Sequence, residues 1–245
     1  MDLYSQISAN KFAKISNFIL DLLFPKTCIN CGKEGFYICQ KCFEKIELNN
    51  LSVCYICNRH TLDNYVCQEC KSKTKLTGML IASHWENELL RQLIYEYKYR
   101  FIKEISRPLS QILINHIKMH NKRLLNIDNL FVSFVPLHKK RIHWRGFNQA
   151  ELLAKELCSC LSVPFGNLLV KQKNTFPQAE IKKQKDRQKN IEQAFFLIHN
   201  PPALEGKNVL LIDDICTTGA TLEECAKTLK PLKPKEIWGL VLARG

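Results

Sequence analysis

The 245-residue sequence predicts an α/β protein with a parallel sheet, preceded by a small cysteine-rich region. The first observation is residues 209–212, an apolar run typical of a strand buried on both faces, which leads into two carboxylates and a small-residue loop. The second is the alternation of similar apolar runs, at 131–136 and 237–242, with segments of helical periodicity. The third is a set of four CxxC pairs between positions 28 and 70.

Composition and charge limit the classes of function. With 46% hydrophobic residues the chain can bury a full core, and its length suits one medium domain plus a small one. The formal net charge of +13 predicts attraction to phosphorylated substrates or nucleic acid, although a generally lysine-rich composition explains it equally well. Because no apolar run is long enough to cross a bilayer and no signal peptide opens the chain, we expect a cytoplasmic protein.

Residues 1–25 carry apolar side chains at close to helical spacing, which predicts an amphipathic helix. The charges of this segment cancel, at Asp2, Lys11, Lys14 and Asp21. A helix on a membrane surface usually carries excess Lys or Arg on its polar face. Packing against the rest of the protein is therefore the favoured interpretation, with membrane contact as the alternative.

The cysteine-rich region predicts two zinc sites. Its pairs are Cys28/Cys31, Cys39/Cys42, Cys54/Cys57 and Cys67/Cys70. Two residues between thiolates place both sulfurs on one turn, and two such turns complete a tetrahedral Cys₄ site. We expect neighbouring pairs to share an ion, with interleaved pairing left open. Disulfides do not suit a reducing cytosol, and the spacing does not fit an iron–sulfur cluster, so structural zinc is predicted.

Residues 85–120 have helical periodicity and a mostly buried apolar stripe. Pro108 predicts a break near Ser106 and Arg107 that divides the segment into two helices. Lys98 and Arg100 lie among tyrosines, a mixture that binds single-stranded nucleic acid by stacking and by charge. A packed helix with a charged outer face is the alternative.

The predicted strand at 131–136 leads into a loop that contains Arg141 and Arg145. If the strands are parallel, these cations reach the same sheet edge as Asp213 and Asp214, where they could hold a pyrophosphate. A helix is expected to follow over 150–161, with Asn148 as its N-cap.

Residues 170–194 are too polar to form core. A mobile hood that closes over a phosphorylated sugar would have this composition, as would a linker or a nucleic-acid contact. Its cations include Lys182, Lys183 and Arg187, which we assign to nucleic-acid binding. A further strand is predicted at 195–198.

The segment after the strand at 209–212 predicts a sugar-phosphate site. Asp213 and Asp214 fall at the strand end, and the loop of Thr217, Thr218, Gly219, Ala220 and Thr221 supplies hydroxyls and backbone N–H groups at a helix N-terminus. The Gly-Lys-Ser/Thr of a Walker A loop and the three glycines of a dinucleotide fingerprint are absent. Paired acids suit vicinal hydroxyls, which donate hydrogen bonds to ionised acceptors. The stretch resembles the 5-phosphoribosyl 1-pyrophosphate (PRPP) motif of type I phosphoribosyltransferases.

The whole pattern resembles the ComF (ComFC) family of competence proteins. The resemblance rests on the CxxC-rich front, Pro136-Leu137-His138, Arg145-Gly146-Phe147-Asn148-Gln149, then Gln178, Arg187 and Asn190, and the PRPP motif. After the helix that the apolar spacing predicts over 1–25, the resemblance implies a double zinc ribbon over 26–76 and a phosphoribosyltransferase-like domain over 77–245.

The resemblance also implies a role for each part. Asp213 and Asp214 would be the catalytic acids that hold the ribose, residues 217–221 would hold the 5-phosphate, and Arg141 with Arg145 the pyrophosphate, together with Mg²⁺. The family handles single-stranded DNA in natural transformation. This role implies partners such as a competence helicase or an inner-membrane DNA channel. It also implies a location in the cytoplasm, or peripherally at that membrane. The alternative function is an active Mg²⁺-dependent phosphoribosyltransferase with an unidentified nucleobase or nucleotide acceptor.

Overall fold

The computed structural model describes residues 25–121, 124, 129–175 and 190–245. The chain forms two compact units, Met1–Ile46 and Glu47–Gly245, which are treated separately below. The predicted helix over 1–25 lies almost entirely outside the described residues, as does most of the predicted hood. None of the helices in the described ranges has the length and apolar character needed to span a membrane.

The first unit is built around cysteine turns. An antiparallel bridge joins Thr27 to Glu34, and the short helix α2 (Gln40–Phe43) begins directly after Cys39. The apolar residues buried in this part of the chain are three cysteines and Ile46. So small a core does not stabilise a fold by itself, which is typical of domains held by metal.

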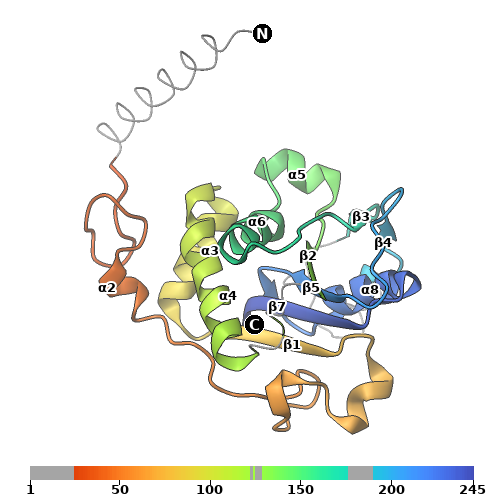
Figure 1. Cartoon of the computed structure of the whole chain (residues 1–245). Coiled ribbons are helices and arrows are strands. Elements are labelled where there is room, and N and C mark those ends of the chain that lie inside the picture. Colours follow the sequence, from red (N-terminus) through yellow and green to blue (C-terminus); the bar gives the residue numbers. More distant parts are fainter. Residues whose placement is uncertain (1–24, 122–123, 125–128, 176–189) are drawn as a thin grey trace. The chain divides into compact units, whose positions relative to one another are not determined.

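The second unit contains a parallel sheet (Figure 1). Its strands are β1 (Gly78–His84), β2 (Leu130–Phe134), β5 (Asn208–Ile212), β6 (Ile215–Cys216) and β7 (Glu236–Arg244). The order across the sheet is β1-β7-β5-β2, and β6 extends the pairing of β7. The predicted strands at 131–136, 209–212 and 237–242 are thereby confirmed, and β5 and β2 are direct neighbours. The carboxyl ends of these two strands therefore open onto one edge.

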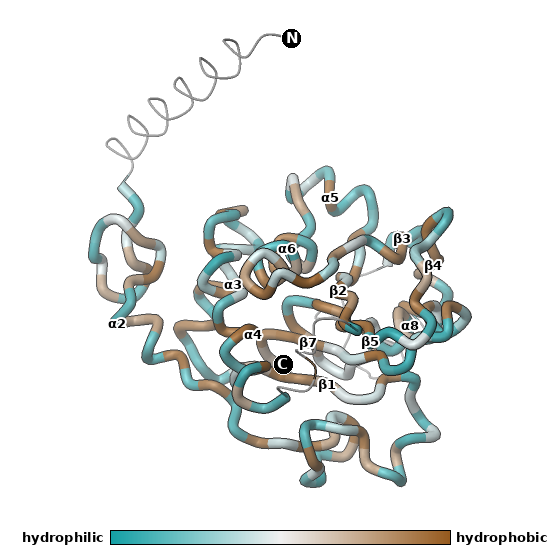
Figure 2. Tube along the Cα trace, viewed as in Figure 1, coloured by the Kyte–Doolittle hydropathy of each residue, from teal (hydrophilic) through white to brown (hydrophobic). Residues whose placement is uncertain are grey.

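Helices cover both faces of the sheet. They are α3 (Glu88–Tyr99), α4 (Ser106–His120), α5 (Lys139–Arg145), α6 (Gln149–Leu161) and α8 (Ala220–Leu229). Val209 and Leu211 of β5 point to the face packed by α8, whereas Leu210 and Ile212 alternate to the face contacted by α6. All four are buried, and brown, apolar stretches run through the region of the sheet in Figure 2.

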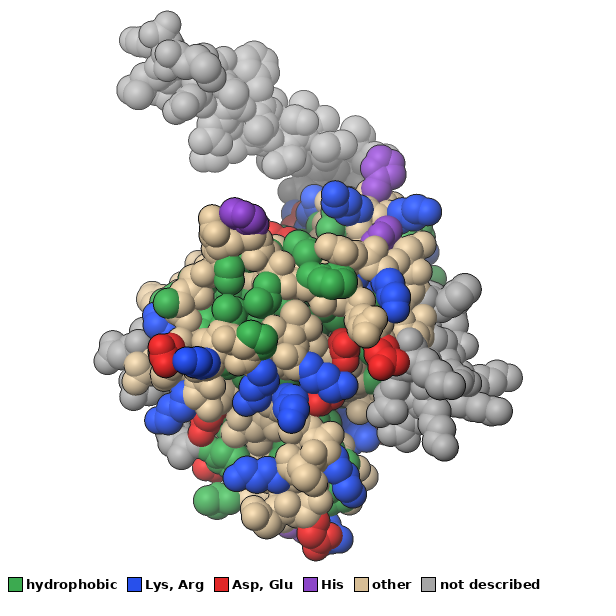
Figure 3. Space-filling view, turned by 90° about the vertical axis from the view of Figure 1, so that its right-hand side faces the viewer, with side chains coloured by type: hydrophobic (Ala, Val, Ile, Leu, Met, Phe, Trp, Pro, Cys, Tyr) green, Lys and Arg blue, Asp and Glu red, His purple; other side chains and the backbone are tan. Residues whose placement is uncertain are grey.

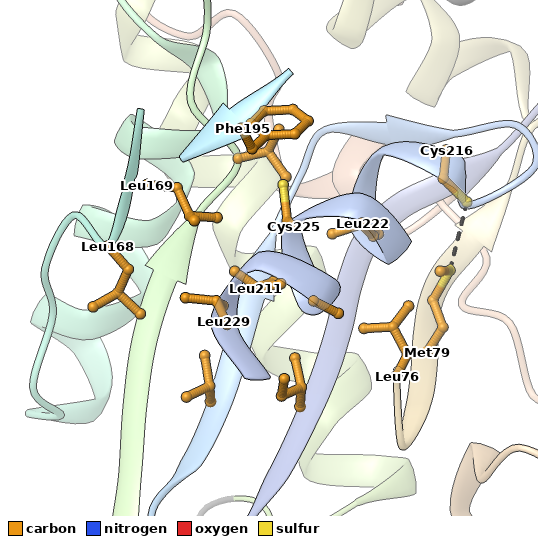
Figure 4. Close-up of a cluster of buried hydrophobic side chains, with 14 of the residues drawn as sticks. Leu76, Met79, Leu168, Leu169, Phe195, Leu211, Cys216, Leu222, Cys225 and Leu229 are labelled. Carbon is orange, nitrogen blue, oxygen red and sulfur yellow. Dashed lines mark hydrogen bonds between the residues drawn. The ribbon is translucent and has the colours of Figure 1, made fainter. Parts of the chain in front are cut away.

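The core beneath α8 joins segments that lie far apart in the sequence (Figure 4). Leu222, Cys225 and Leu229 of α8 pack over Leu211. Cys216 lies at the edge of this cluster, and its Sγ is 3.6 Å from Met79 Sδ. A two-stranded antiparallel sheet, β3 (Leu169–Lys171) with β4 (Phe195–Leu197), closes the other side and confirms the strand predicted at 195–198.

The break between the two predicted helices is shifted along the chain. Helix α3 ends at Tyr99, and Phe101 has a left-handed backbone with φ of 59°, so the turn precedes the predicted position at Ser106 and Arg107. Pro108 lies in the first turn of α4, where its missing N–H leaves no helical hydrogen bond unmade. Helix α6 agrees with its prediction, because Asn148 caps it by accepting a hydrogen bond from Ala150 N.

The chain divides into its two compact units between Ile46 and Glu47, within the zinc ribbon predicted over 26–76. Cys54 to Cys70 belong to the same compact unit as the sheet. Tyr65 makes an edge-to-face contact with Trp238 of β7, with ring centroids 4.7 Å apart. A side chain at Gly78 would lie 2.3 Å from the Trp238 ring, so only glycine permits this close approach. The second cysteine group is therefore packed onto the sheet.

Candidate functional site

The acidic pair lies where the sequence places it, directly after β5. Asp213 N still donates to Leu240 O of β7, so the ladder of the sheet fixes the start of the turn. Asp213 Oδ1 accepts from Asp214 N at 2.9 Å, and Asp214 Oδ1 accepts from Ile215 N at 2.6 Å. A carboxylate has about four lone-pair positions, so each group can accept further hydrogen bonds from a ligand.

A buried lysine neutralises one of the two acids. Lys98 Nζ of α3 lies 2.8 Å from Asp214 Oδ1, and the two side chains are only 10% and 12% exposed. Burial and the neighbouring Asp214 raise the pKa of Asp213 to about 7, against the opposing influence of Lys98 and Lys171. Asp213 is therefore about half protonated near neutral pH, and a cation or a hydrogen-bond donor bound beside it would favour loss of this proton.

The loop of residues 217–221 forms the opposite wall. Gly219 has φ of 79° and sits at the N-cap of α8, while Thr218 Oγ1 accepts from Ala220 N at 3.3 Å. The left-handed glycine turns the loop so that α8 begins at the site. Backbone N–H groups at such a helix N-terminus bind phosphate oxygens, which the helix dipole also favours.

Cations from three other elements complete the site. Arg141 and Arg145 belong to α5, which follows β2 and has His138 as its N-cap. Arg141 Nη2 donates to Thr175 O at 2.9 Å, and Arg145 Nη1 donates to Gln149 Oε1 at 3.0 Å. Within the described chain, Arg145 Nε is buried and has no hydrogen-bond partner, which is unusual for a buried donor.

Lys171 of β3 is the other added cation. Burial, together with the nearby Arg141, lowers the pKa of Lys171 to about 8. An anion bound between these two side chains would reverse that effect. In the sequence, Lys171 belongs to the polar segment that begins at residue 170, which gave no sign of its position. In the structure, the pairing of β3 with β4 brings Lys171 to the site.

These groups line one cavity of about 160 Å³. It brings together all the residues predicted to bind the sugar phosphate: Asp213, Asp214, Thr217, Thr218, Gly219, Ala220, Thr221, Arg141 and Arg145. Lys98, Tyr99, Pro136 and Lys171 were not predicted to lie there. The cavity offers acceptors on one side and amide, hydroxyl and cationic donors around them, which suits a ligand that has both hydroxyls and anionic groups.

The residues predicted to bind nucleic acid have separate locations. Lys98 is a correction, because it is buried against Asp214 and does not present its charge to solvent. Its signal is in the sequence, since Lys98 continues the apolar series Leu90 and Ile94 at steps of four. Arg100 is exposed at the end of α3. Lys182, Lys183 and Arg187 lie outside the described residues.

The cysteines form two candidate zinc centres. Within each set, the Sγ atoms lie within 4.8 Å of one another: Cys28, Cys31, Cys39 and Cys42 in the first, and Cys54, Cys57, Cys67 and Cys70 in the second. The grouping of neighbouring pairs is therefore confirmed. Cys31 and Cys39 Sγ are 3.6 Å apart and Cys57 and Cys67 Sγ 3.5 Å, close to the ~3.8 Å edge of a ZnS₄ tetrahedron and far beyond a disulfide bond.

The polar surroundings of the first set also suit zinc. Burial opposes ionisation of Cys28, but backbone N–H groups of Cys39, Cys31 and Asn30 outweigh it and lower the pKa of Cys28 to about 6. Asn30 Nδ2 donates to Cys42 Sγ at 3.1 Å. Thiolates are the form that binds the metal, so both sets fit two structural zinc ions.

The second cysteine set contacts the phosphate-binding loop. Arg244, at the end of β7, donates from Nη1 to Tyr55 O at 2.7 Å and from Nε to Thr217 O at 3.1 Å. The Tyr55 ring lies over Gly219, and its hydroxyl is 2.6 Å from Thr74 Oγ1. Thr74 in turn donates to Glu223 of α8. One CxxC turn thus supports the loop from behind.

Comparisons with known proteins agree with this architecture. The family described as "Phosphoribosyl transferase domain" matches residues 142–245, and the family described as "Double zinc ribbon domain" matches residues 19–77. The zinc ribbon family therefore spans both cysteine sets, although the structure assigns them to separate compact units.

Several known proteins are similar to this chain over more than half of its length. Competence protein F of Haemophilus influenzae is 35% identical over 169 residues, which cover 67% of this chain and 72% of that protein. Competence protein ComFC of Bacillus subtilis is 30% identical over 200 residues, covering 78% and 77%. DNA utilization protein YhgH of Escherichia coli is 32% identical over 143 residues, covering 57% and 60%.

Proposed function

Because this chain belongs to the ComF family of competence proteins, we propose that it binds PRPP and handles single-stranded DNA during natural transformation. The observation that carries the PRPP proposal is the single cavity in which two carboxylates face a helix N-terminus and a group of cations. PRPP is a pentose with two hydroxyls, a phosphate and a pyrophosphate, and each of these groups finds a complementary partner there.

The assignment follows the chemistry of each wall. Residues 217–221 hold the 5-phosphate, as backbone N–H groups at a helix N-terminus do. Asp213 and Asp214 accept hydrogen bonds from the ribose hydroxyls. Arg141, Arg145 and Lys171 hold the pyrophosphate, and the buried Nε of Arg145 finds a partner in one of its oxygens.

Mg²⁺ fits the same site. It prefers carboxylate and phosphate oxygens and usually keeps several waters, so the acidic pair and the pyrophosphate would hold it together. The ion would supply charge neutralisation for the pyrophosphate. Beside it, Lys98 pairs with Asp214, and Asp213 can lose its proton as the ligand binds.

Calorimetric titration with Mg²⁺–PRPP tests the proposal. We expect saturable binding with one site per chain, lost or strongly weakened in Asp214→Asn. Glu205→Gln is the matched control, because it also removes one carboxylate but lies exposed outside the cavity. Equal affinity of Asp214→Asn and Glu205→Gln would remove the acidic pair from the binding site.

The DNA-handling part of the proposal rests on the family and on charge. Two relatives are named competence proteins and one a DNA utilization protein, and this chain has a net charge of +13. On the face that includes β3, β4 and α8, Lys and Arg side chains are widely spread (Figure 3). Arg100, Lys182, Lys183 and Arg187 are the proposed contacts. An oligothymidylate should bind with an affinity that falls steeply with salt, and neutralising these four side chains should reduce the slope. Binding of the oligothymidylate with an affinity that does not depend on salt would contradict the proposed DNA contacts.

A protein partner is proposed for the first zinc unit. The proposed partner is a helicase or an inner-membrane DNA channel, and the first zinc unit is compact in its own right. Cys28→Ser in the full chain should weaken capture of such a partner while leaving Mg²⁺–PRPP affinity unchanged. If Cys28→Ser lost both partner capture and Mg²⁺–PRPP binding, the first zinc unit would serve the ligand site instead.

A further inference from the structure

Aromatic side chains surround Arg145 beside the sugar-phosphate cavity. The Arg145 guanidinium carbon lies 5.8 Å from the centroid of the Tyr99 ring and 5.7 Å from the nearer ring centroid of Trp144. Phe101 extends the group, because its ring meets Trp144 edge to face with centroids 5.3 Å apart. We call Tyr99, Phe101, Trp144 and Arg145 the aromatic cluster. It joins the end of α3 to α5, two elements that are distant in the sequence.

The aromatic cluster is open to solvent although its rings are large and apolar. Trp144 is 61% exposed and Tyr99 is 49% exposed. Helix α5, which carries Trp144, has no buried residue, so this tryptophan does not serve the core of the fold. Single exposed aromatics are common, whereas a contiguous group of them is typical of an interaction surface.

Exposed cations flank the aromatic cluster on both elements. They are Arg100 and Lys103 after α3, and Lys139 and Lys140 at the start of α5. In the sequence, α5 contains no acid, and Glu104 is the one acid between α3 and α4. Proteins bind single strands with this combination, because bases stack on the rings and phosphates pair with the cations. The cluster therefore suits a single-stranded nucleic acid.

A membrane surface can also attract aromatics and cations, but α5 lacks the apolar face that it requires. Ile142 and Trp144 are the exposed large apolar residues of this helix, and they lie two positions apart, so they point to different sides. A helix that lies in a membrane surface has its apolar residues on one side. The single strand is therefore the partner that the aromatic cluster fits.

We propose that the aromatic cluster is a stacking platform for the bases of single-stranded DNA, and that the strand competes with PRPP for Arg145. The inference rests on the proposed function, which supplies both ligands. Arg145 belongs to the platform and also lines the cavity, where its guanidinium is assigned to the pyrophosphate. A pyrophosphate bound there neutralises this charge and repels the phosphates of a strand. By linkage, the strand weakens PRPP binding by the same factor.

Fluorescence anisotropy of a labelled oligothymidylate tests the platform in the full chain with zinc bound. Trp144→Ala should weaken binding about tenfold, as expected for the loss of one stacked base, and Trp144→Phe should recover most of this loss. Phe196→Ala is the matched control, because Phe196 is an exposed aromatic (43%) on β4 in the same compact unit. Equal affinities of Trp144→Ala and Phe196→Ala would overturn the inference.

The salt dependence of binding separates stacking from charge. Stacking releases no counterions, so Trp144→Ala should lower the affinity by the same factor at every salt concentration and leave the salt slope unchanged. Neutralising the proposed cationic contacts should reduce that slope instead. A salt-dependent affinity that Trp144→Ala does not change would overturn the inference and leave the proposed function standing. A wild type that binds no oligothymidylate would overturn the DNA-handling part of the proposed function, and this inference with it.

Tryptophan fluorescence locates the strand independently. The chain has three tryptophans, of which Trp238 is fully buried. Oligothymidylate should quench the emission, and the quenching should be lost in Trp144→Phe but kept in Trp85→Phe. Quenching that depends on Trp85 would place the strand elsewhere and overturn the inference. Binding to anionic lipid vesicles that Trp144→Ala abolishes, without an effect on oligothymidylate, would also overturn it, because the cluster would then serve a membrane.

The competition is measured by repeating the anisotropy titration with saturating Mg²⁺–PRPP. The affinity for oligothymidylate should fall about fivefold, a typical coupling between two sites, and calorimetry with the oligonucleotide present should show the same factor for Mg²⁺–PRPP. Asp214→Asn is the control for ionic strength, because it should not bind Mg²⁺–PRPP and should therefore show no fall. An oligothymidylate affinity that bound Mg²⁺–PRPP does not change would overturn the shared use of Arg145.

Discussion

Replacing Gly219 by alanine tests how the second cysteine set supports the phosphate-binding loop. Gly219 has φ of 79°, and the left-handed backbone costs a residue with a side chain about 1–2 kcal/mol. A Cβ would also lie 3.1 Å from the Tyr55 ring and 3.2 Å from Met79 Cε. Met79 can shift, but Tyr55 is buried and its hydroxyl is bonded to Thr74. The crowding should add about 1 kcal/mol, at the low end of overpacking costs.

A control variant at Gly206 separates the cost of the left-handed backbone from the cost of crowding. Gly206 has a similar φ of 73°, and a Cβ there would have no neighbour within 4 Å. Gly206→Ala should therefore lower the free energy of unfolding by about 1–2 kcal/mol and Gly219→Ala by about 2–3 kcal/mol. Urea denaturation of both variants measures the difference. Calorimetry should show weaker Mg²⁺–PRPP binding in Gly219→Ala alone.

Equal destabilisation of the two variants would refute this reasoning. It would mean that the loop and Tyr55 separate without cost, so that the second cysteine set does not set the loop conformation. An unchanged Mg²⁺–PRPP affinity in Gly219→Ala would likewise show that the loop tolerates displacement.

Three further predictions concern charge and metal. Lys98→Met leaves the buried Asp214 carboxylate without its cation and should lower the free energy of unfolding, measured in urea, by about 3–5 kcal/mol. Adding Asp214→Leu should recover most of this loss, whereas a loss below about 0.5 kcal/mol in Lys98→Met would contradict the buried ion pair. Because the pKa of Asp213 is raised to about 7, the affinity for Mg²⁺–PRPP should fall about tenfold as the pH is lowered from 8 to 6. Without ligand, the free energy of unfolding should decline as the pH rises from about 4 to 7, and Asp213→Asn should reduce both pH dependences. Cys54→Ser should remove one zinc ion, measured by metal analysis, and weaken Mg²⁺–PRPP binding, whereas Cys28→Ser should remove one zinc ion and leave that binding unchanged. Equal Mg²⁺–PRPP affinities of the two variants would show that the second zinc site does not support the ligand site more than the first.

The sequence predicts much of the fold because its signals are local. The strand at β5, the acids after it and the small-residue loop are contiguous, so their arrangement follows from the geometry of a strand that leads into a helix. The capping of α6 by Asn148 and the grouping of adjacent CxxC pairs are equally local.

Features that depend on distant contacts were harder to predict. The two cysteine sets have the same CxxC spacing, yet the second belongs to the compact unit of the sheet, where Tyr65 contacts Trp238. Lys171 reaches the cavity because β3 pairs with β4 across a long intervening segment. The turn at Phe101 depends on one left-handed residue that composition does not reveal. The burial of Lys98 was readable from its place in the apolar series, but its partner Asp214 was not.

The central place of β7 has a consequence for how the protein is made. This strand lies between β1 and β5 and also pairs with β6, although it follows all of them in the chain. While the ribosome is still translating residues 236–244, the nascent chain holds β1 and β5 with unpaired edges, which are prone to wrong association. Folding of the second unit must therefore await nearly its whole length, and chaperones that protect exposed strands should matter for its yield in the cell.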